Sequence, residues 1–346
     1  MTLDRDSLLL VTGATGLVGG AVAARAAAES IPVRAIVRAT SDTSYLDSLG
    51  VACVVADFGS VDSLRRAADG ATHIVHAAAK VGDWGDPRDY IDANVGGTQR
   101  LVDAVPKSLR RFVHISSLGV YPARDHHGTD ETAAVADGGI DGYTRSKIEA
   151  EQVVREAAAA GLPAVLLRPG FVYGPRDQTV IPRIIERVRD GKFAYLGSGD
   201  QLLNNVYVEN LADAIFLALV SDYNEIVREG LELNVTDPRL VSKREFIGSI
   251  AEGAGLRPPS RQVPLPLARL VARGLEAVWR WRGKQEAPLL SQARIKFLGL
   301  NLDFSSERAR RCLGYDPQVD FEDAMRSTMQ EMMAGERAGS DDAASR

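Results

Sequence analysis

The sequence predicts an α/β protein in which a doubly wound parallel sheet is joined to a smaller, mostly helical C-terminal domain. Short, continuously apolar runs alternate with longer helical patterns as far as about residue 175. Such runs are typical of strands that are buried on both faces of a parallel sheet. A glycine-rich turn follows the first run, and the alternation becomes irregular beyond residue 176, which indicates the second domain.

The first strand is expected at residues 7–12, and a glycine-rich turn follows it directly. Gly13, Gly16 and Gly19 are spaced three apart, and the alanine-rich continuation favours a helix. Strand, glycine turn and helix form the context in which a backbone approaches a pyrophosphate, as in the Rossmann fold. The expected cofactor contacts of this turn are Gly13, Thr15, Gly16, Leu17 and Gly19. The alternative is a tight turn that binds no ligand.

The next two strands, at 32–38 and 51–57, end in residues that bear on the choice of cofactor. An acidic residue about 20 positions after the glycine motif would hold the ribose hydroxyls of NAD. Arg38 occupies that place and suits a 2′-phosphate, so NADP(H) is favoured and NAD(H) is the alternative. A surface arginine at a strand end would look the same. Asp57, followed by Phe58, is expected to accept a hydrogen bond from the adenine amino group.

Three more strands are expected, at 72–79, 110–121 and 163–175. Ligands of doubly wound sheets lie at the carboxyl ends of the strands, so residues there are candidates for the site. Further cofactor contacts are expected at Ala77, Ala78, Ala79, Pro169, Gly170 and Val172. The fifth strand ends in two serines, Ser116 and Ser117.

Residues 141–152 predict a helix that brings Tyr143 and Lys147 together on one face. A phenol keeps its proton up to about pH 10, and a neighbouring cation favours the phenolate. The pair is therefore a candidate proton donor or acceptor near neutral pH. Taken alone, the same spacing also fits a solvated helix face.

Beyond residue 176 the sequence predicts helices at 179–192, within 196–219 and at 243–255, and a returning strand at 230–236. The segment 261–284 combines six basic residues with one Glu and places Leu, Val and Trp at helical spacings. It fits a helix in peripheral contact with a membrane, a lid over an apolar substrate, or an ordinary packed helix of the smaller domain. The polar tail at 334–346 is expected to be disordered.

Composition excludes several function classes. The net charge of −5 over 346 residues argues against nucleic-acid binding, which needs a basic field. The two cysteines, Cys53 and Cys312, have no metal-ligand spacing and favour a reducing, cytoplasmic location. The N-terminal residues do not form a secretory signal, and no apolar run is long enough to span a membrane. The adjacent His126 and His127 do not indicate a metal site.

Residues 7 to 330 resemble the extended short-chain dehydrogenase/reductase superfamily. The matching motifs are TGATGLVG (12–19), HAAA (76–79), NVGGT (94–98), ISSLGVY (115–121), YTRSK (143–147) and RPGFVYGP (168–175). The six motifs occur in the order and at the spacing found in that superfamily, and together they are highly specific for it. The resemblance also implies a homodimer formed through the helices that hold Asn94 and Tyr143.

The resemblance implies four catalytic residues. Tyr143 would be the acid/base, and Lys147 would hold the nicotinamide ribose and lower the pKa of Tyr143. Ser117 would hydrogen-bond the substrate oxygen, and Asn94 would support a water relay to Lys147. Ser117 is preferred to Ser116 because it lies four residues before Tyr121, as the family serine does before its motif tyrosine.

Departures from family motifs narrow the reaction. Sugar 4,6-dehydratases carry Thr-Asp-Glu where this chain has residues 117–119, Ser-Leu-Gly. Sugar-nucleotide epimerases usually carry an Arg-Asp-Phe that the stretch 202–214 lacks, since it has no charge before Glu209. That stretch and residues 77–85 resemble the 3β-hydroxysteroid/sterol-4α-carboxylate dehydrogenase branch and the 2-alkyl-3-oxoalkanoate reductases. The expected substrate is therefore a small apolar molecule, and the expected reaction is hydride transfer between NADP(H) and its alcohol or ketone.

Two other functions stay open, a nucleotide-sugar epimerase with retained NAD and a non-catalytic NADP-sensing protein. Either would use the same predicted domains. Residues 1–175 and about 206–236 would form the dinucleotide-binding domain, and about 176–205 and 237–333 would form the substrate domain.

Overall fold

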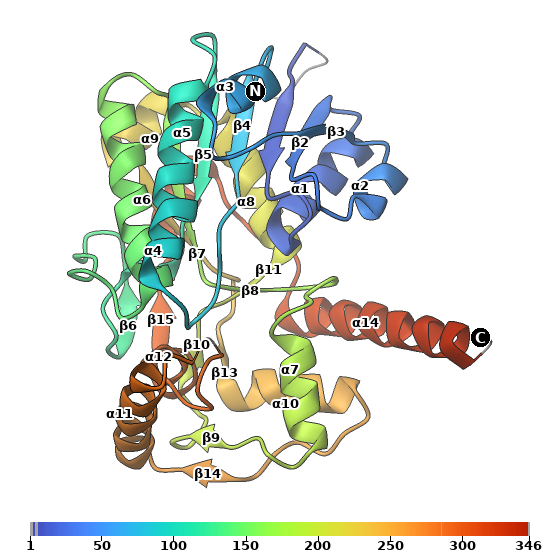
Figure 1. Cartoon of the computed structure of the whole chain (residues 1–346), viewed down its shortest axis with the longest axis vertical. Coiled ribbons are helices and arrows are strands. Elements are labelled where there is room, and N and C mark those ends of the chain that lie inside the picture. Colours follow the sequence, from blue (N-terminus) through green and yellow to red (C-terminus); the bar gives the residue numbers. More distant parts are fainter. Residues whose placement is uncertain (1–2, 4–5, 285, 345–346) are drawn as a thin grey trace.

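The computed structural model describes residues 3, 6–284 and 286–344, with side chains described as far as residue 334. Its centre is a parallel sheet of seven strands in the order of a doubly wound fold (Figure 1), which confirms the predicted fold class. Across the sheet the strands are β12 (Glu232–Val235), β7 (Ala164–Pro169), β5 (Arg111–Ile115), β4 (His73–His76), β1 (Leu9–Thr12), β2 (Val33–Val37) and β3 (Ala52–Val55).

Helices cover both faces of this sheet, which explains why most residues of its strands are apolar. Leu9 and Val11 pack into one apolar cluster, whereas Leu10 between them packs into another on the opposite face. The first cluster includes helices α1 (Leu17–Ala28), α8 (Val208–Val220), α9 (Tyr223–Glu229) and α13 (Glu307–Leu313). The second includes α3 (Val61–Ala67), α5 (Gly97–Ala104) and α6 (Gly142–Ala159).

A third apolar cluster, formed largely by the C-terminal half, is built around aromatic side chains, with Tyr173, Phe246 and Phe321 fully buried. The elements of this part are α7 (Ile181–Arg189), α10 (Lys243–Gly253), α11 (Leu265–Trp281), α12 (Gln292–Gly299) and α14 (Phe321–Ala344), with the strand pairs β9 (Tyr195–Leu196) and β14 (Gln262–Val263), and β10 (Leu202–Leu203) and β13 (Val241–Ser242). Figure 1 shows most of them gathered at one end of the sheet.

Three local features differ from the sequence-based expectations. The sixth strand divides into β7 and β8 (Phe171–Tyr173), because β7 pairs with β5 and β12 of the central sheet whereas β8 pairs with β11 (Asn205–Tyr207). Helix α13, which the sequence assigns to the substrate domain, packs on the sheet through Ala309 and Leu313. The predicted domain boundaries otherwise stay a prediction.

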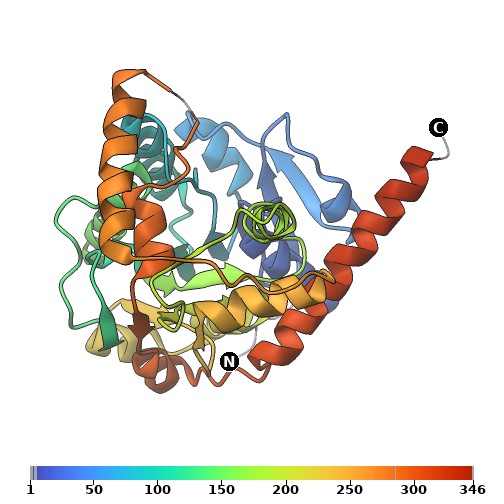
Figure 2. The ribbon, with the colours of Figure 1, turned by 90° about the horizontal axis from the view of Figure 1, so that it is seen from below.

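The third difference concerns the tail, where disorder was expected from residue 334. Helix α14 instead continues to Ala344, while residues 345–346 lie outside the described part of the chain. Alanine and glutamate favour helix, and no proline interrupts the segment. Figures 1 and 2 show its C-terminal half projecting away from the rest of the chain. Within the described residues, no helix is long and apolar enough to cross a membrane.

Candidate active site

Helix α6 carries the proposed proton donor, and its start is defined by a capping box. The Asp141 carboxylate accepts a hydrogen bond from the backbone N–H of Thr144 at 2.7 Å, and the Thr144 hydroxyl accepts from the backbone N–H of Asp141 at 3.2 Å. At Gly142 a Cβ would lie 2.8 Å from the ring of Tyr90, so only glycine fits there without displacement. The first turn, with Tyr143, is therefore held against the neighbouring helix.

Tyr143 and Lys147 lie together, as the sequence predicts. The Lys147 ammonium is 6.0 Å from the centroid of the Tyr143 ring and donates to the carbonyl oxygen of Ile115 at 2.8 Å. Burial lowers the pKa of Lys147 to about 8, against the opposing effect of the Glu151 carboxylate. At neutral pH Lys147 is therefore still mostly protonated.

The sequence predicts that Lys147 lowers the pKa of Tyr143, and in this structure that direction is wrong. Burial raises the pKa of Tyr143 to about 12, and a hydrogen bond with Ser117 only partly opposes this rise. Lys147 does not reverse it, because its ammonium is directed to the backbone of β5. Tyr143 is consequently held in the protonated form, the form that donates.

The two serines that follow β5 have different surroundings. The Ser116 hydroxyl is buried and donates to the Glu151 carboxylate at 2.6 Å. The Ser117 oxygen accepts from the backbone N–H of Gly119 at 2.9 Å, and Ser117 also forms the hydrogen bond with Tyr143. Of the two, only Ser117 therefore shares a hydrogen bond with the phenol.

Glu151, one helical turn after Lys147, organises a buried ionic cluster that sequence reasoning missed. Its carboxylate is fully buried and accepts two hydrogen bonds from Arg168, at 2.8 and 2.7 Å. Arg155 adds a third at 2.9 Å. Glu151 raises the pKa of Arg168, although burial opposes this rise. The available signal was a single charge, Arg168, inside the apolar run of the sixth strand.

Asn94 lies in a short π-helix, η1 (Ile91–Gly96), between α4 (Pro87–Tyr90) and α5. Its amide oxygen accepts from the backbone N–H of Lys80 at 2.6 Å. Its amide nitrogen donates to the Lys80 carbonyl at 3.0 Å and to the Ser146 hydroxyl oxygen at 2.8 Å. Ser146 in turn donates to the carbonyl oxygen of Tyr143 at 2.8 Å. Asn94 thus ties the loop after β4 to the turn that carries Tyr143.

A chain of buried hydrogen bonds links Asn94 to the glycine turn. The Thr98 hydroxyl donates to the carbonyl oxygen of Asn94 at 2.5 Å, so it accepts from Nε2–H of His76 at 3.0 Å. Nδ1 of His76 then accepts from the Thr12 hydroxyl at 2.8 Å, whose oxygen accepts from the backbone N–H of Ala78 at 3.1 Å. Burial lowers the pKa of His76 to about 3, in keeping with this neutral tautomer.

The glycine turn has the shape that a pyrophosphate requires. Gly13 has φ +70°, and a Cβ there would lie 2.7 Å from the backbone nitrogen of Ala78. A side chain at Gly19 would collide with the carbonyl of Gly13, so α1 begins directly against the turn. Thr15 and Gly16 are exposed at the start of α1. This backbone cradle fits a dinucleotide at the helix N-terminus.

The other predicted cofactor residues lie around this edge of the sheet. Leu17, Ala77, Ala78, Ala79, Phe58, Gly170 and Val172 are half-buried, Pro169 ends β7 within the core, and Arg38 and Asp57 are exposed after β2 and β3. The Asp57 carboxylate accepts from the backbone N–H of Gly59 at 2.8 Å. The Phe58 ring stacks at 6.1 Å from His76, which connects this end of the site to the buried histidine.

Lys296, on α12, is a second buried cation that sequence reasoning missed. Its ammonium donates to the carbonyl oxygens of Gly119 at 2.7 Å and Tyr121 at 2.6 Å. Burial lowers the pKa of Lys296 to about 8, with the Asp141 carboxylate opposing. Because these carbonyls belong to the turn that begins at Ser117, the C-terminal part of the chain helps to hold the serine in place. No motif signals a residue so distant in sequence.

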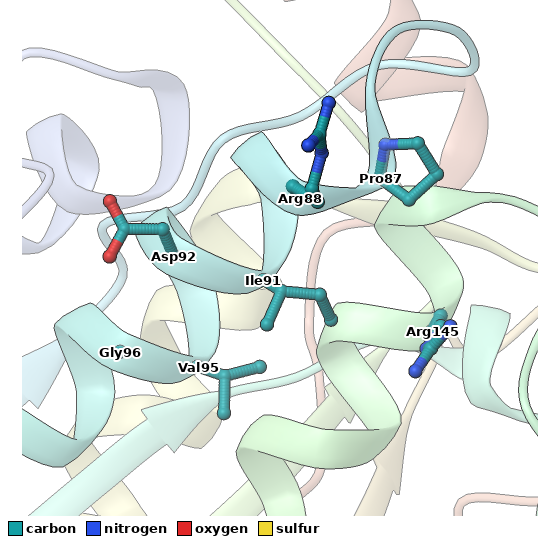
Figure 3. A pocket seen from close by; sticks show the side chains of 7 residues that line it. All are labelled: Pro87, Arg88, Ile91, Asp92, Val95, Gly96 and Arg145. Carbon is teal, nitrogen blue, oxygen red and sulfur yellow. The ribbon is translucent and has the colours of Figure 1, made fainter.

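A surface groove is formed by α4, η1 and α6 (Figure 3). It is lined by Pro87, Arg88, Ile91, Asp92, Val95, Gly96 and Arg145. In the figure, most of these belong to α4 and η1, and Arg145 reaches in from α6. Tyr143 and Lys147 are not among its lining residues, so the groove is separate from the candidate active site. Among the described residues, no group of three His, Cys, Asp or Glu side chains is placed to hold a metal.

The chain is similar to known proteins along most of its length. The profile of the NAD dependent epimerase/dehydratase family matches residues 9–230. The 2-alkyl-3-oxoalkanoate reductase of Shewanella oneidensis is 30% identical over 326 residues, covering 91% of this chain and 84% of that protein. The 3 beta-hydroxysteroid dehydrogenase/Delta 5→4-isomerase of Mycobacterium tuberculosis is 30% identical over 329 residues, covering 92% of this chain and 88% of that protein. The UDP-glucuronic acid 4-epimerase of Bacillus cereus, solved with NAD, is 21% identical with a TM-score of 0.73, covering 94% of this chain and 99% of that chain.

Proposed function

The chain belongs to the NAD dependent epimerase/dehydratase family, within the extended short-chain dehydrogenases/reductases, and from this premise we propose the reaction that it catalyses. The resemblance in its motifs is thereby confirmed, and it is an enzyme of dehydrogenase/reductase type. We propose that it interconverts a secondary alcohol and a ketone on a hydrophobic, steroid-like or β-keto acid-like substrate. The observation that carries the proposal is the convergence of Ser117, Tyr143 and Lys147 after β5 and at the start of α6.

Each of the three side chains has a proposed role in the reducing direction. Tyr143, kept protonated by the desolvation of its phenol group, donates its proton to the alkoxide as it forms. Ser117 holds the same oxygen, and donors placed where charge develops are typically the largest contribution to the rate. Lys147 presents its charge beside the phenol ring and holds the cofactor ribose. The bound dinucleotide supplies the hydride.

The cofactor we propose is NADP(H), with NAD(H) as the alternative. The family is NAD-dependent by description, and the glycine cradle suits either dinucleotide. The preference rests on Arg38, which is exposed directly after β2 where an acidic residue would otherwise hold the ribose hydroxyls. A guanidinium there is suited to a 2′-phosphate, which it can bind through two parallel hydrogen bonds.

An apolar substrate is supported by two observations. Two relatives that match at 30% identity are named for an alkylated oxoalkanoate and a hydroxysteroid. The stretch 202–207 of this chain is uncharged and largely buried, so it has no side chain to pair with a nucleotide phosphate. The epimerase alternative rests on a fold similarity to UDP-glucuronic acid 4-epimerase.

The deciding experiment is a cofactor-oxidation screen of NADPH against NADH over steroid ketones, β-keto acids and sugar nucleotides. We expect NADPH oxidation with apolar ketones and none with sugar nucleotides. Tightly retained NAD together with interconversion of UDP-sugars would favour the epimerase. Cofactor binding without oxidation by any ketone would favour the NADP-sensing alternative.

We also propose a homodimer formed through the helices that hold Asn94 and Tyr143. The groove of Figure 3 lies between them and exposes part of Ile91 and Val95. Light scattering of wild type and Val95→Glu tests this proposal, since a charge buried in the dimer interface should yield monomers.

A cytoplasmic location, which the two free cysteines favour, stays a prediction.

A further inference from the structure

Helix α11 packs against the rest of the chain through one narrow face. Ala268, Ala272 and Glu276, spaced four apart, are buried, and the two alanines join an apolar cluster with Leu196 and Ile295. The neighbouring helix on this side is α12. Figures 1 and 2 show α11 at the periphery of the molecule, so its other side is free within the described chain.

The opposite side of α11 is apolar and exposed. Leu267, Leu270, Val271, Val278 and Trp281 are 52, 69, 44, 41 and 83% exposed. At about 100° per residue these five side chains project away from the packed alanines. They account for more than half of the large hydrophobic side chains that are exposed among the described residues. An apolar patch concentrated on one helix in this way indicates an interaction surface.

The borders of this apolar face are basic. Arg269, Arg273 and Arg280 follow one edge of the helix, and Arg282 and Lys284 lie at its C-terminal end, all exposed. The only acidic side chain of 261–284 is Glu276, which is buried and accepts from the backbone N–H of Gln292 at 2.7 Å. The segment is therefore strongly cationic within a chain whose net charge is −5.

We propose that the outer face of α11 docks on the surface of an anionic lipid bilayer. The apolar side chains would enter the boundary between headgroups and acyl chains, with the arginines on the phosphates and Trp281 at the interface. A second copy of this chain is a poorer occupant, because the face offers no exposed acidic residue to receive the arginines of its partner. The proposal stands on exposure and charge, and does not depend on the reaction proposed above.

The docking face is connected to the candidate active site. The indole N–H of Trp84 donates to the carbonyl oxygen of Lys284 at 2.9 Å, and Asp83 forms an ion pair with Arg294 at 2.6 Å. These contacts hold the loop after β4, which includes Lys80, against the C-terminal end of α11 and against α12. Asn94 holds the backbone of Lys80 from the other side. A bilayer at α11 would therefore lie beside the loop that borders the site.

Co-sedimentation of the full chain with vesicles tests the proposal. Vesicles of phosphatidylcholine are compared with and without added phosphatidylglycerol, using wild type, the double variant Leu270→Glu/Trp281→Glu, and Val227→Glu. Val227 is a matched control, because it is 51% exposed on α9. We expect binding to the anionic vesicles that the double variant weakens about tenfold or more and the control leaves unchanged.

Three outcomes would overturn the proposal. These are no binding of wild type to either vesicle, binding that the double variant retains, and binding independent of phosphatidylglycerol. A dimer that only the double variant disrupts, without vesicle binding, would assign the face to a second copy instead. Because the substituted side chains are exposed, thermal unfolding of both variants should match wild type, which separates lost binding from lost folding.

Discussion

Replacing Glu151 with Gln should destabilise the chain strongly, because it removes the charge that balances a buried cation. The carboxylate accepts four hydrogen bonds, from Ser116, twice from Arg168, and from Arg155. Arg168 is only 3% exposed, so its guanidinium would be left without a buried counter-ion. Breaking such a pair typically costs about 3–5 kcal/mol, which for a chain of this size lowers Tm by roughly 5 °C.

The assay is urea and thermal unfolding of Glu151→Gln beside Glu149→Gln. Glu149 lies on the same helix and pairs with Arg145 at 2.7 Å, but both side chains are well exposed. The control should therefore lose at most about 0.5 kcal/mol. The double variant Glu151→Leu/Arg168→Met should recover much of the lost stability, because it removes both buried charges.

Glu151→Gln should also change the pH dependence of kcat/KM, which a variant that is merely less stable would not do. The carboxylate raises the pKa of Lys147, so its removal should move the alkaline decline of kcat/KM to lower pH. A loss of stability below about 1 kcal/mol with an unchanged pH profile would refute the account of this cluster.

Three further predictions concern the site and its buried lysines. Lys296→Met should lower kcat about tenfold or more while cofactor affinity is kept, because Ser117 loses its support, and Lys192→Met, on an exposed side chain, should have no effect. Arg38→Glu should lower kcat/KM with NADPH relative to NADH by roughly tenfold to a hundredfold, and an unchanged ratio would exclude Arg38 from the 2′-phosphate. The pKa values of Lys147, Lys243 and Lys296 are lowered to about 8, 7 and 8, so the unfolded chain binds more protons up to about pH 10.4. Urea unfolding should therefore show a free energy of unfolding that rises by at least about 1 kcal/mol from pH 7.5 to 9.5, and a flat or falling profile would contradict these burial effects.

Local patterns in the sequence were sufficient for the fold and for part of the site. The glycine turn was predictable because strand, turn and helix are consecutive and Gly13 has a backbone that only glycine adopts readily. The spacing of Tyr143 and Lys147 was predictable because one helical turn joins them. The choice of Ser117 over Ser116 agrees with their hydrogen bonds, since Ser116 is bonded to Glu151.

Features that depend on packing were not predictable in the same way. Lys296 contacts Gly119 across 177 positions, and no local pattern reports such a contact. The direction of the Tyr143 pKa shift depends on how deeply the phenol is buried, and a helical spacing contains no information on burial. Likewise, the amphipathic pattern of α11 predicted a helix, whereas only the structure shows that Leu270 and Trp281 are exposed.

The most direct test of the central claim is the single-turnover oxidation of NADPH by an apolar ketone, with wild type and Tyr143→Phe compared at equal cofactor occupancy. The substitution removes only the phenolic hydroxyl, so cofactor binding and thermal unfolding should be unchanged. We expect wild type to oxidise NADPH and Tyr143→Phe to be slower by about 10²–10⁴-fold, the loss typical of a removed proton donor. A Tyr143→Phe rate within about tenfold of wild type would contradict the role of Tyr143 as the proton donor.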